Sequence, residues 1–202
     1  MQIESKFEFQ IKILIIGDSG VGKTNFIFQF TEGKFTPIYV TTVGFDFKTK
    51  IINLPKSKKT VQLQIYDTAG QERYMALSKS LFQKVQGIII MYDITNRDSY
   101  ENLPIWFKAV NETISNKTII LVGNKVDLSK EQRIVTEEEG EKLAKENKIS
   151  FYEASSCTGE NVDNIFMRMT EKIYKRLMDE KSDNANMRIN LNKKNKGKKK
   201  CC

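Results

Sequence analysis

The stretch FEFQIKILIIGDSGVGKT, residues 7–24, decides the fold of this chain. Its first part, Phe7–Ile16, is rich in β-forming residues and ends in an apolar run, as is typical of a strand buried on both faces of a parallel sheet. Its second part, Gly17–Thr24, matches G-x-x-x-x-G-K-[ST], and Asn25–Phe30 is apolar at helical spacing. This order predicts a strand, a phosphate-binding loop and a helix.

The loop residues have separate expected roles. Lys23 is expected to reach the β- and γ-phosphates of a nucleotide, and the Thr24 hydroxyl to bind Mg²⁺. The glycines allow the backbone to wrap around the phosphates, so we expect phosphate contacts from Ser19, Gly20, Val21, Gly22, Lys23 and Thr24. A chance match to this pattern would occur in about one of a few hundred chains of this length.

Strands and helices alternate along the rest of the chain. The β-rich runs are Phe45–Leu54, Thr60–Tyr66, Gly87–Asp93, Thr118–Asn124 and Ile149–Glu153, the first two joined by the polar turn Pro55–Lys59. The helical runs are Ser99–Ile114, a helix to Asn147 opened by a capping box of Thr136 and Glu139, and a final helix whose one face holds Val162, Ile165, Phe166, Met169 and Ile173. The expected fold is α/β, a P-loop NTPase with a doubly wound, mostly parallel sheet of about six strands, one of them antiparallel, flanked by helices.

Composition limits the architecture and the class of protein. With 202 residues, 40% of them hydrophobic, the chain is expected to form one domain. Its apolar runs are too short to span a membrane, and no secretory signal is visible, so we expect a cytosolic protein. Three cysteines, two of them adjacent at the end, do not form a disulfide framework.

The positive charge belongs to the end of the chain. Residues 181–202 hold eight Lys or Arg and one Asp, a charge of +7 out of the total of +8. The remainder is nearly neutral, which argues against a nucleic-acid-binding face. Beyond Asp179 the chain loses large apolar residues, so we divide it into a domain over residues 1–179 and a disordered polybasic tail over 180–202.

Two further loops complete the expected site. Asp67 ends a strand and opens DTAGQ, where a second ligand to Mg²⁺ is needed, and there the Gly70 N–H can meet the γ-phosphate while Gln71 orients a water. The run Asn124-Lys125-Val126-Asp127 follows another strand. The Asp127 carboxylate can accept hydrogen bonds from N1–H and the N2 amine of guanine, a pair that adenine cannot supply. The expected ligand is therefore GTP or GDP.

Together, GDSGVGKT, DTAGQE, NKVD and the terminal Cys-Cys resemble the Rab branch of Ras-like small GTPases over about residues 8–178. The resemblance implies that Thr42 closes on Mg²⁺ and the γ-phosphate and that Phe35 packs against guanine. It assigns a third guanine loop to Ser155, Ser156 and Cys157, where the family usually has Ser-Ala-Lys. Tyr66 stands where Rab proteins usually have Trp, and Leu81–Val85 also departs from them. Phe47, Tyr66 and Leu81 match a hydrophobic triad that faces effectors, although packing between sheet and helix explains them about as well.

The tail implies a membrane anchor. Six lysines precede Cys201 and Cys202, and by resemblance paired terminal cysteines carry geranylgeranyl groups. Two lipid chains with nearby lysines give stable anchoring. The resemblance further implies an exchange factor, a GTPase-activating protein, effectors, a prenylation escort and a GDP-dissociation inhibitor. We expect a monomer that regulates vesicle traffic on the cytoplasmic face of an intracellular membrane, with a cytosolic pool and no nucleic-acid partner.

The inferred reaction is GTP + H₂O → GDP + phosphate, with water held by Gln71 and charge met by Lys23, Mg²⁺ and loop amides. Lys34–Val43 contains no arginine, so hydrolysis is expected to be slow without an activating protein. The alternatives are a scaffold that holds nucleotide without cycling, suggested by Cys157, and an ATP-using P-loop enzyme or nucleic-acid binder. Hydrolysis assays separate the first, and competition between ATP and GTP separates the second.

Overall fold

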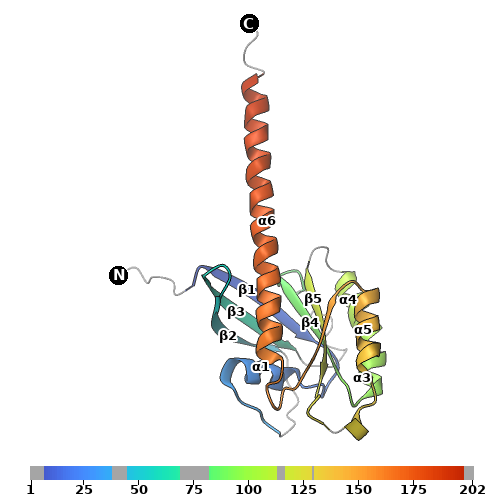
Figure 1. Cartoon of the computed structure of the whole chain (residues 1–202). Helices are drawn as coiled ribbons and strands as arrows, with labels where there is room; N and C mark the ends of the chain where they lie inside the picture. Colours follow the sequence, from blue (N-terminus) through green and yellow to red (C-terminus); the bar gives the residue numbers. More distant parts are fainter. Residues whose placement is uncertain (1–6, 38–44, 69–81, 113–116, 129, 198–202) are drawn as a thin grey trace.

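The computed structural model describes residues 7–37, 45–68, 82–112, 117–128 and 130–197. Its centre is a six-stranded sheet in the order β2-β3-β1-β4-β5-β6, and of the described strand pairings only β2 with β3 is antiparallel. The strands are β1 (Phe9–Ile16), β2 (Phe45–Leu54), β3 (Lys59–Thr68), β4 (Gly87–Asp93), β5 (Thr118–Asn124) and β6 (Ser150–Ala154). The predicted fold class is therefore confirmed (Figure 1).

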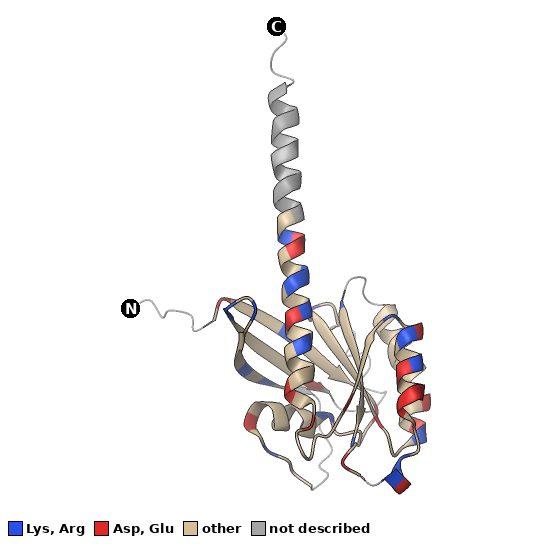
Figure 2. Ribbon diagram, in the orientation of Figure 1, with Lys and Arg blue, Asp and Glu red and all other residues tan. Residues whose placement is uncertain are grey.

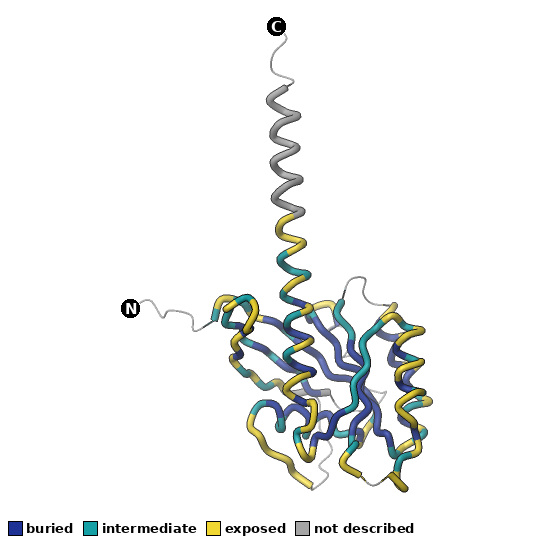
Figure 3. Tube along the Cα trace, in the orientation of Figure 1, coloured by how far each residue is buried: buried dark blue, intermediate teal, exposed yellow. Residues whose placement is uncertain are grey.

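Helices cover both faces of this sheet. They are α1 (Lys23–Glu32), α3 (Arg97–Glu101), α4 (Leu103–Asn111), α5 (Glu137–Glu146) and α6 (Val162–Gly197), with a short 3₁₀ helix, η2 (Lys130–Gln132). Strand β1 serves both layers, because successive side chains of a strand point to opposite faces. Ile13 and Ile15 join the core under α1 and α6, whereas Leu14 and Ile16 join the core under α4 and α5. Charged residues are frequent along α5 (Figure 2), and the central strands are buried (Figure 3).

Turn and capping residues in the sequence mark the boundaries of several strands and helices. The turn between β2 and β3 closes with a hydrogen bond from the Lys58 N–H to the Leu54 carbonyl. At the start of α5, the predicted capping box is confirmed: the Glu139 N–H donates to Thr136 Oγ1 and the Thr136 N–H to Glu139 Oε2, at 3.3 and 2.9 Å. Such boxes satisfy helix N–H groups that have no partner in the helix.

The helix predicted over Ser99–Ile114 is wrong as a single helix. In the structure α3 ends before Asn102 and α4 begins after it. Pro104 stands in the first turn of α4, and a proline has no backbone N–H to continue the preceding helix. Helix α4 ends at Asn111 with Glu112 as its C-cap, and Ile114, the predicted end of the helix, lies outside the described residues.

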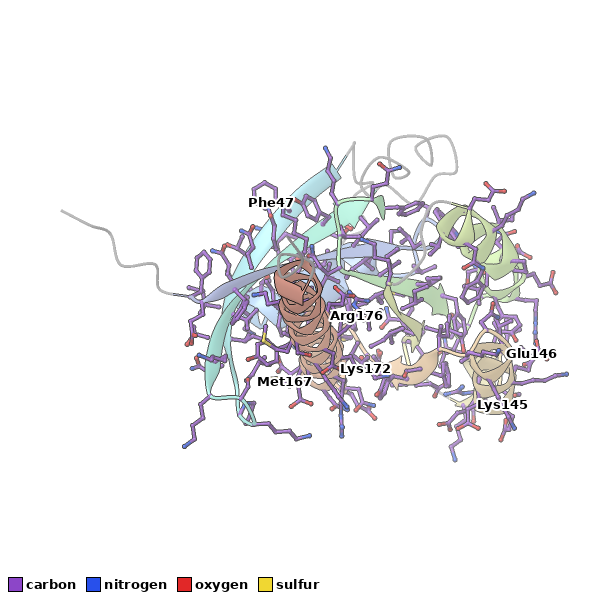
Figure 4. All side chains as sticks on the ribbon, turned by 90° about the horizontal axis from the view of Figure 1, so that it is seen from above. Phe47, Lys145, Glu146, Met167, Lys172 and Arg176 are labelled. Atoms are coloured by element: carbon purple, nitrogen blue, oxygen red, sulfur yellow. The ribbon has the colours of Figure 1, made fainter. Side chains whose placement is uncertain are left out.

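Helix α6 packs through its first half and then leaves the body of the protein (Figure 1). Its predicted apolar face is confirmed, since Val162, Ile165, Phe166, Met169 and Ile173 are all buried. Arg176 donates to Thr118 Oγ1 at 3.1 Å and to the Gln86 carbonyl at 3.0 Å, which ties the helix to the sheet (Figure 4).

The helix continues to Gly197, so its backbone is helical where the sequence predicted a disordered tail from residue 180. No proline and no earlier glycine interrupts α6, which leaves the helix without a breaker up to that point. The division into residues 1–179 and 180–202 stays a prediction. None of the described helices is both long and apolar enough to cross a membrane.

Candidate nucleotide site

The loop between β1 and α1 has the backbone of a phosphate cradle. Gly17 and Gly22 lie at φ 142° and 99°, which side chains other than that of glycine rarely allow. A Cβ on Gly17 would come 2.1 Å from the Met91 carbonyl oxygen, and one on Gly22 would come 2.4 Å from Asn124 Nδ2. Gly22 is also the N-cap of α1, where the first backbone N–H groups have no partner inside the helix. The loop can therefore wrap closely around an anion.

Lys23 lies buried under this loop. Its ammonium donates to the carbonyl oxygens of Gly17 and Asp18, at 2.9 and 2.7 Å. Burial lowers the pKa of Lys23 from its ordinary 10.5 to about 8, and the nearby carboxylates of Asp67 and Asp18 act in the opposite direction. Removing an ammonium from water disfavours its charged form, so an anion placed beside Lys23 would restore the preference for that form.

Thr24 and Asp67 meet at the edge of the sheet, as expected of two ligands to one ion. The Thr24 hydroxyl on α1 donates to Asp67 Oδ2 at 2.6 Å, and Asp67 is buried near the end of β3. A hydroxyl and a carboxylate are hard oxygen ligands, and Mg²⁺ is commonly held by one or two protein oxygens together with phosphate oxygens and water. The pair therefore fits Mg²⁺.

Asn124 joins the base-side loop to the phosphate loop. It ends β5, is buried, and donates from Nδ2 to the Val21 carbonyl at 2.8 Å. Its Oδ1 accepts from the backbone N–H and the hydroxyl of Ser156, each at 3.0 Å. One amide thus connects three loops. The sequence placed Asn124 in the site but did not indicate this connecting role.

Asp127 and Ser155 form the outer part of the base side. The Ser155 hydroxyl donates to Asp127 Oδ1 at 2.5 Å and accepts from the backbone N–H groups of Cys157 and Thr158, at 3.1 and 2.9 Å. Asp127 itself is exposed, so its carboxylate is oriented and still accessible. The Cys157 side chain is an exposed free thiol, and only its backbone takes part in this loop.

Asp93 contacts Lys125 and is a site residue that was not predicted from the sequence. The Lys125 ammonium lies 2.6 Å from Oδ2 of Asp93, a buried carboxylate at the end of β4. Asp93 Oδ1 also accepts from the backbone N–H and hydroxyl of Thr95, at 2.8 and 2.7 Å. An acidic residue at the end of an otherwise apolar strand was the available signal. The pair holds Lys125, whose φ is 77°, in the middle of the base-side loop.

The segment after α1 is held by a residue of α1. Asn25 donates from Nδ2 to the Thr36 carbonyl at 2.8 Å, and its Oδ1 accepts from the Thr36 N–H at 3.1 Å. These two bonds fix the backbone beside Phe35, whose ring is 40% exposed. Phe35 is therefore available to pack against a bound base. No signal in the sequence marked Asn25.

The remaining predicted residues lie mostly outside the described part of the chain. These are Thr42, Gly70, Gln71, Leu81, Cys201 and Cys202. Of the proposed effector triad, Phe47 and Tyr66 are described, and their ring centroids lie 5.9 Å apart. Phe47 is 49% exposed on β2 (Figure 4). Exposure of that size leaves Phe47 accessible on the surface of β2.

Comparison with known proteins places the chain in a family. A sequence model described as the Ras family matches residues 12–175. The Ras-related protein SEC4 of Saccharomyces cerevisiae is 40% identical over an alignment of 199 residues that covers 95% of this chain and 91% of that protein. The GTP-binding protein ypt2 of Schizosaccharomyces pombe is 39% identical over 97% of this chain and 98% of its own length. The Ras-related protein Rab-10 of Caenorhabditis elegans is 38% identical over 91% and 90%.

Proposed function

The chain belongs to the Ras family as a Rab-type small GTPase, and from this premise we propose that Gly17–Thr24, Asp67, Asn124–Asp127 and Ser155–Cys157 form its guanine-nucleotide site. The observation that carries the proposal is the hydrogen bond from Asn124 to the Val21 carbonyl. It brings the loop suited to a base against the loop suited to phosphates. A nucleotide can therefore bind both loops at once.

The phosphate loop binds through its backbone and Lys23. The N–H groups of residues 19–24 meet the phosphate oxygens at the N-terminus of α1. On binding, the Lys23 ammonium turns from the carbonyls of Gly17 and Asp18 to the β- and γ-phosphates. Charge-assisted bonds to phosphate are stronger than bonds to neutral carbonyls, which favours this exchange.

The base side reads guanine with oriented polar groups. Asp127 accepts from N1–H and the N2 amine, while Ser155 holds its carboxylate in place. Ser156 contributes its backbone, and Phe35 and Lys125 cover the faces of the base. Adenine would leave the Asp127 carboxylate without these two donors, and an unpaired group in a binding site costs affinity.

Thr24 and Asp67 would hold Mg²⁺, and Thr42 would join them when GTP is bound. The Thr24 hydroxyl oxygen and Asp67 Oδ2 lie 2.6 Å apart, which supports this assignment. When bound, the ion neutralises charge on the phosphate oxygens. Thr42 lies outside the described residues, as do Gly70, which we assign to the γ-phosphate, and Gln71, which we assign to the attacking water.

Hydrolysis of GTP acts as a timer for a switch. Gln71 positions water for attack on the γ-phosphorus in line with the bond to the leaving GDP, and Lys23 and the loop amides stabilise the charge that develops. Loss of the γ-phosphate removes the contacts of Thr42 and Gly70, so the surface that binds effectors changes. An exchange factor reloads GTP, and a GTPase-activating protein supplies the arginine that Lys34–Val43 lacks.

The switch works in vesicle traffic on the cytoplasmic face of an intracellular membrane. Geranylgeranyl groups on Cys201 and Cys202, with the neighbouring lysines, anchor it there after delivery by a prenylation escort. A GDP-dissociation inhibitor maintains the cytosolic pool. A tagged chain with both cysteines changed to serine should become diffuse, and identical distributions of the two chains would reject the anchor.

Single-turnover hydrolysis tests the function itself. Wild-type protein loaded with GTP should convert it slowly to GDP, and Gln71→Leu should hydrolyse it at least about tenfold more slowly, because the water is no longer oriented. GTP-loaded and GDP-loaded protein should retain different partners. Stable GTP in the wild-type protein, together with equal partner binding by both forms, would favour the non-cycling scaffold.

A further inference from the structure

Asp18 places a negative charge inside the proposed phosphate loop. Its carboxylate does not meet Lys23, which instead donates to the Asp18 backbone carbonyl at 2.7 Å. The carboxylate accepts from two neutral donors far away in the sequence. Trp106 Nε1–H donates to Oδ1 and Asn102 Nδ2 to Oδ2, each at 2.7 Å. Both oxygens are therefore bound to the helical layer formed by α3 and α4.

The break between α3 and α4 makes these donors available. Asn102 occupies the junction, and its side chain makes no capping hydrogen bond to α4. Its amide is thus directed to Asp18. Trp106 is 4% exposed in the core beneath α4, so packing fixes its ring. An indole N–H is a donor only, which suits a carboxylate partner. Pro104 contributes by ending the continuous helix at this point.

A released Asp18 carboxylate would oppose nucleotide binding. It could approach the phosphates, where like charges repel, or pair with the Lys23 ammonium and occupy it. Either outcome weakens the contact between the loop and the phosphates. The two donors prevent both outcomes, because they satisfy each carboxylate oxygen on the side of α4.

We propose that Asn102 and Trp106 are positioning residues that hold the Asp18 carboxylate away from the nucleotide phosphates and so slow nucleotide release. This inference rests on the proposed nucleotide site. It identifies the junction of α3 and α4 as a place from which the release rate is set, although neither residue contacts the nucleotide.

The test measures release of a fluorescent GDP analogue from full-length protein. Asn102→Ala should accelerate release about fivefold, because one charge-assisted hydrogen bond is lost. The matched control is Asn111→Ala, an exposed residue at the end of the same helical layer, which should leave the rate unchanged. In the Asp18→Asn background, adding Asn102→Ala should cause no further acceleration, because the charge is gone.

The double variant separates charge positioning from simple structural damage. Equal acceleration by Asn102→Ala in both backgrounds, or none in either, would overturn the proposal. Trp106→Phe, which keeps an aromatic ring and removes the donor, repeats the same comparison if Asn102→Ala does not fold. Failure of wild-type protein to bind GDP would reject the nucleotide site itself, which is a different result.

A spectroscopic readout reports on the contact directly. Trp106 is the single tryptophan of the chain, so a proton–nitrogen correlation NMR spectrum contains one indole N–H signal. In GDP-loaded protein this signal should move upfield with Asp18→Asn, because the acceptor loses its charge, and should stay in place with Asn111→Ala. If the chemical shift of the indole signal is the same in the wild type and in Asp18→Asn, the hydrogen bond on which the inference depends is absent.

Discussion

The phosphate side and the base side of the proposed nucleotide site use different chemistry at one edge of the same sheet. On the phosphate side, an ammonium, a hydroxyl and a carboxylate contact one another or loop carbonyls, as in the pairs Lys23–Gly17 and Thr24–Asp67. On the base side, neutral hydrogen bonds link the loops, as in Asn124 with Val21 and Ser156, and the charged pair of Lys125 and Asp93 holds one loop in place. The phosphate side should therefore respond to changes of charge, and the base side to the loss of individual hydrogen bonds.

Removing the ammonium of the phosphate side should have the largest effect. Lys23→Met keeps much of the side-chain volume, and we expect GDP affinity to fall at least about 100-fold, since two charge-assisted contacts are lost. Equilibrium binding by calorimetry checks this. Lys145→Met, on the exposed surface of α5, is the control and should bind as the wild type does. If GDP affinity falls by less than about threefold, the charge of Lys23 does not drive phosphate binding.

Changing the base-reading carboxylate should have the next largest effect and should alter selectivity. Asp127→Asn removes an acceptor for guanine, so GTP affinity should fall about 30-fold while xanthine nucleotides gain. Ser155 can still donate to the remaining oxygen, so the loop should stay folded. Competition between GTP and XTP measures the shift, with Asp179→Asn as an exposed control. Parallel weakening of both nucleotides would mean that Asp127 does not read the base.

The pH dependence sharpens the contrast, because Lys23 titrates with a pKa of about 8 in the nucleotide-free protein. Phosphate binding favours its protonated form, so GDP affinity should fall above about pH 8, by up to about tenfold per pH unit. In the folded protein the pKa of Lys23 is about 8, below its ordinary value of 10.5. Between these two pH values the unfolded chain therefore binds more protons than the folded protein. Stability of the nucleotide-free protein should therefore rise with pH over that range.

Two measurements separate these effects. Titration calorimetry at pH values from about 7 to 9 follows GDP affinity, and denaturant unfolding over about pH 8 to 10.5 follows stability. Lys23→Met should abolish the stability increase that this group contributes, whereas Lys145→Met should retain it. A stability curve that is the same in wild type and Lys23→Met would contradict the lowered pKa.

The smallest effect is expected at Cys157 on the base side. Its thiol is exposed, and only its backbone N–H binds Ser155. Cys157→Ala should therefore change the GDP release rate by no more than about twofold. Stopped-flow release of a fluorescent GDP checks this, and a much larger change would show that the thiol itself covers the base.

Much of the fold could be predicted because its signals are local. The apolar runs that became β4 and β5 and the capping pair Thr136 and Glu139 depend on neighbouring residues alone. The prediction failed where a single residue outweighed a periodic pattern, because Pro104 divided a helix that the apolar spacing suggested was continuous.

The sequence alone determined the order of the six strands and the motif residues of the proposed site, because periodicity and motif spacing are properties of consecutive residues. The tertiary structure decided which of these residues meet. Asn124 reaches Val21 across 103 positions, and Trp106 reaches Asp18 across 88. Such pairs exist because the parallel order β3-β1-β4-β5 brings the carboxyl ends of these strands to one edge of the sheet. No pattern along the chain encodes that proximity, since it depends on how the strands are arranged in the sheet.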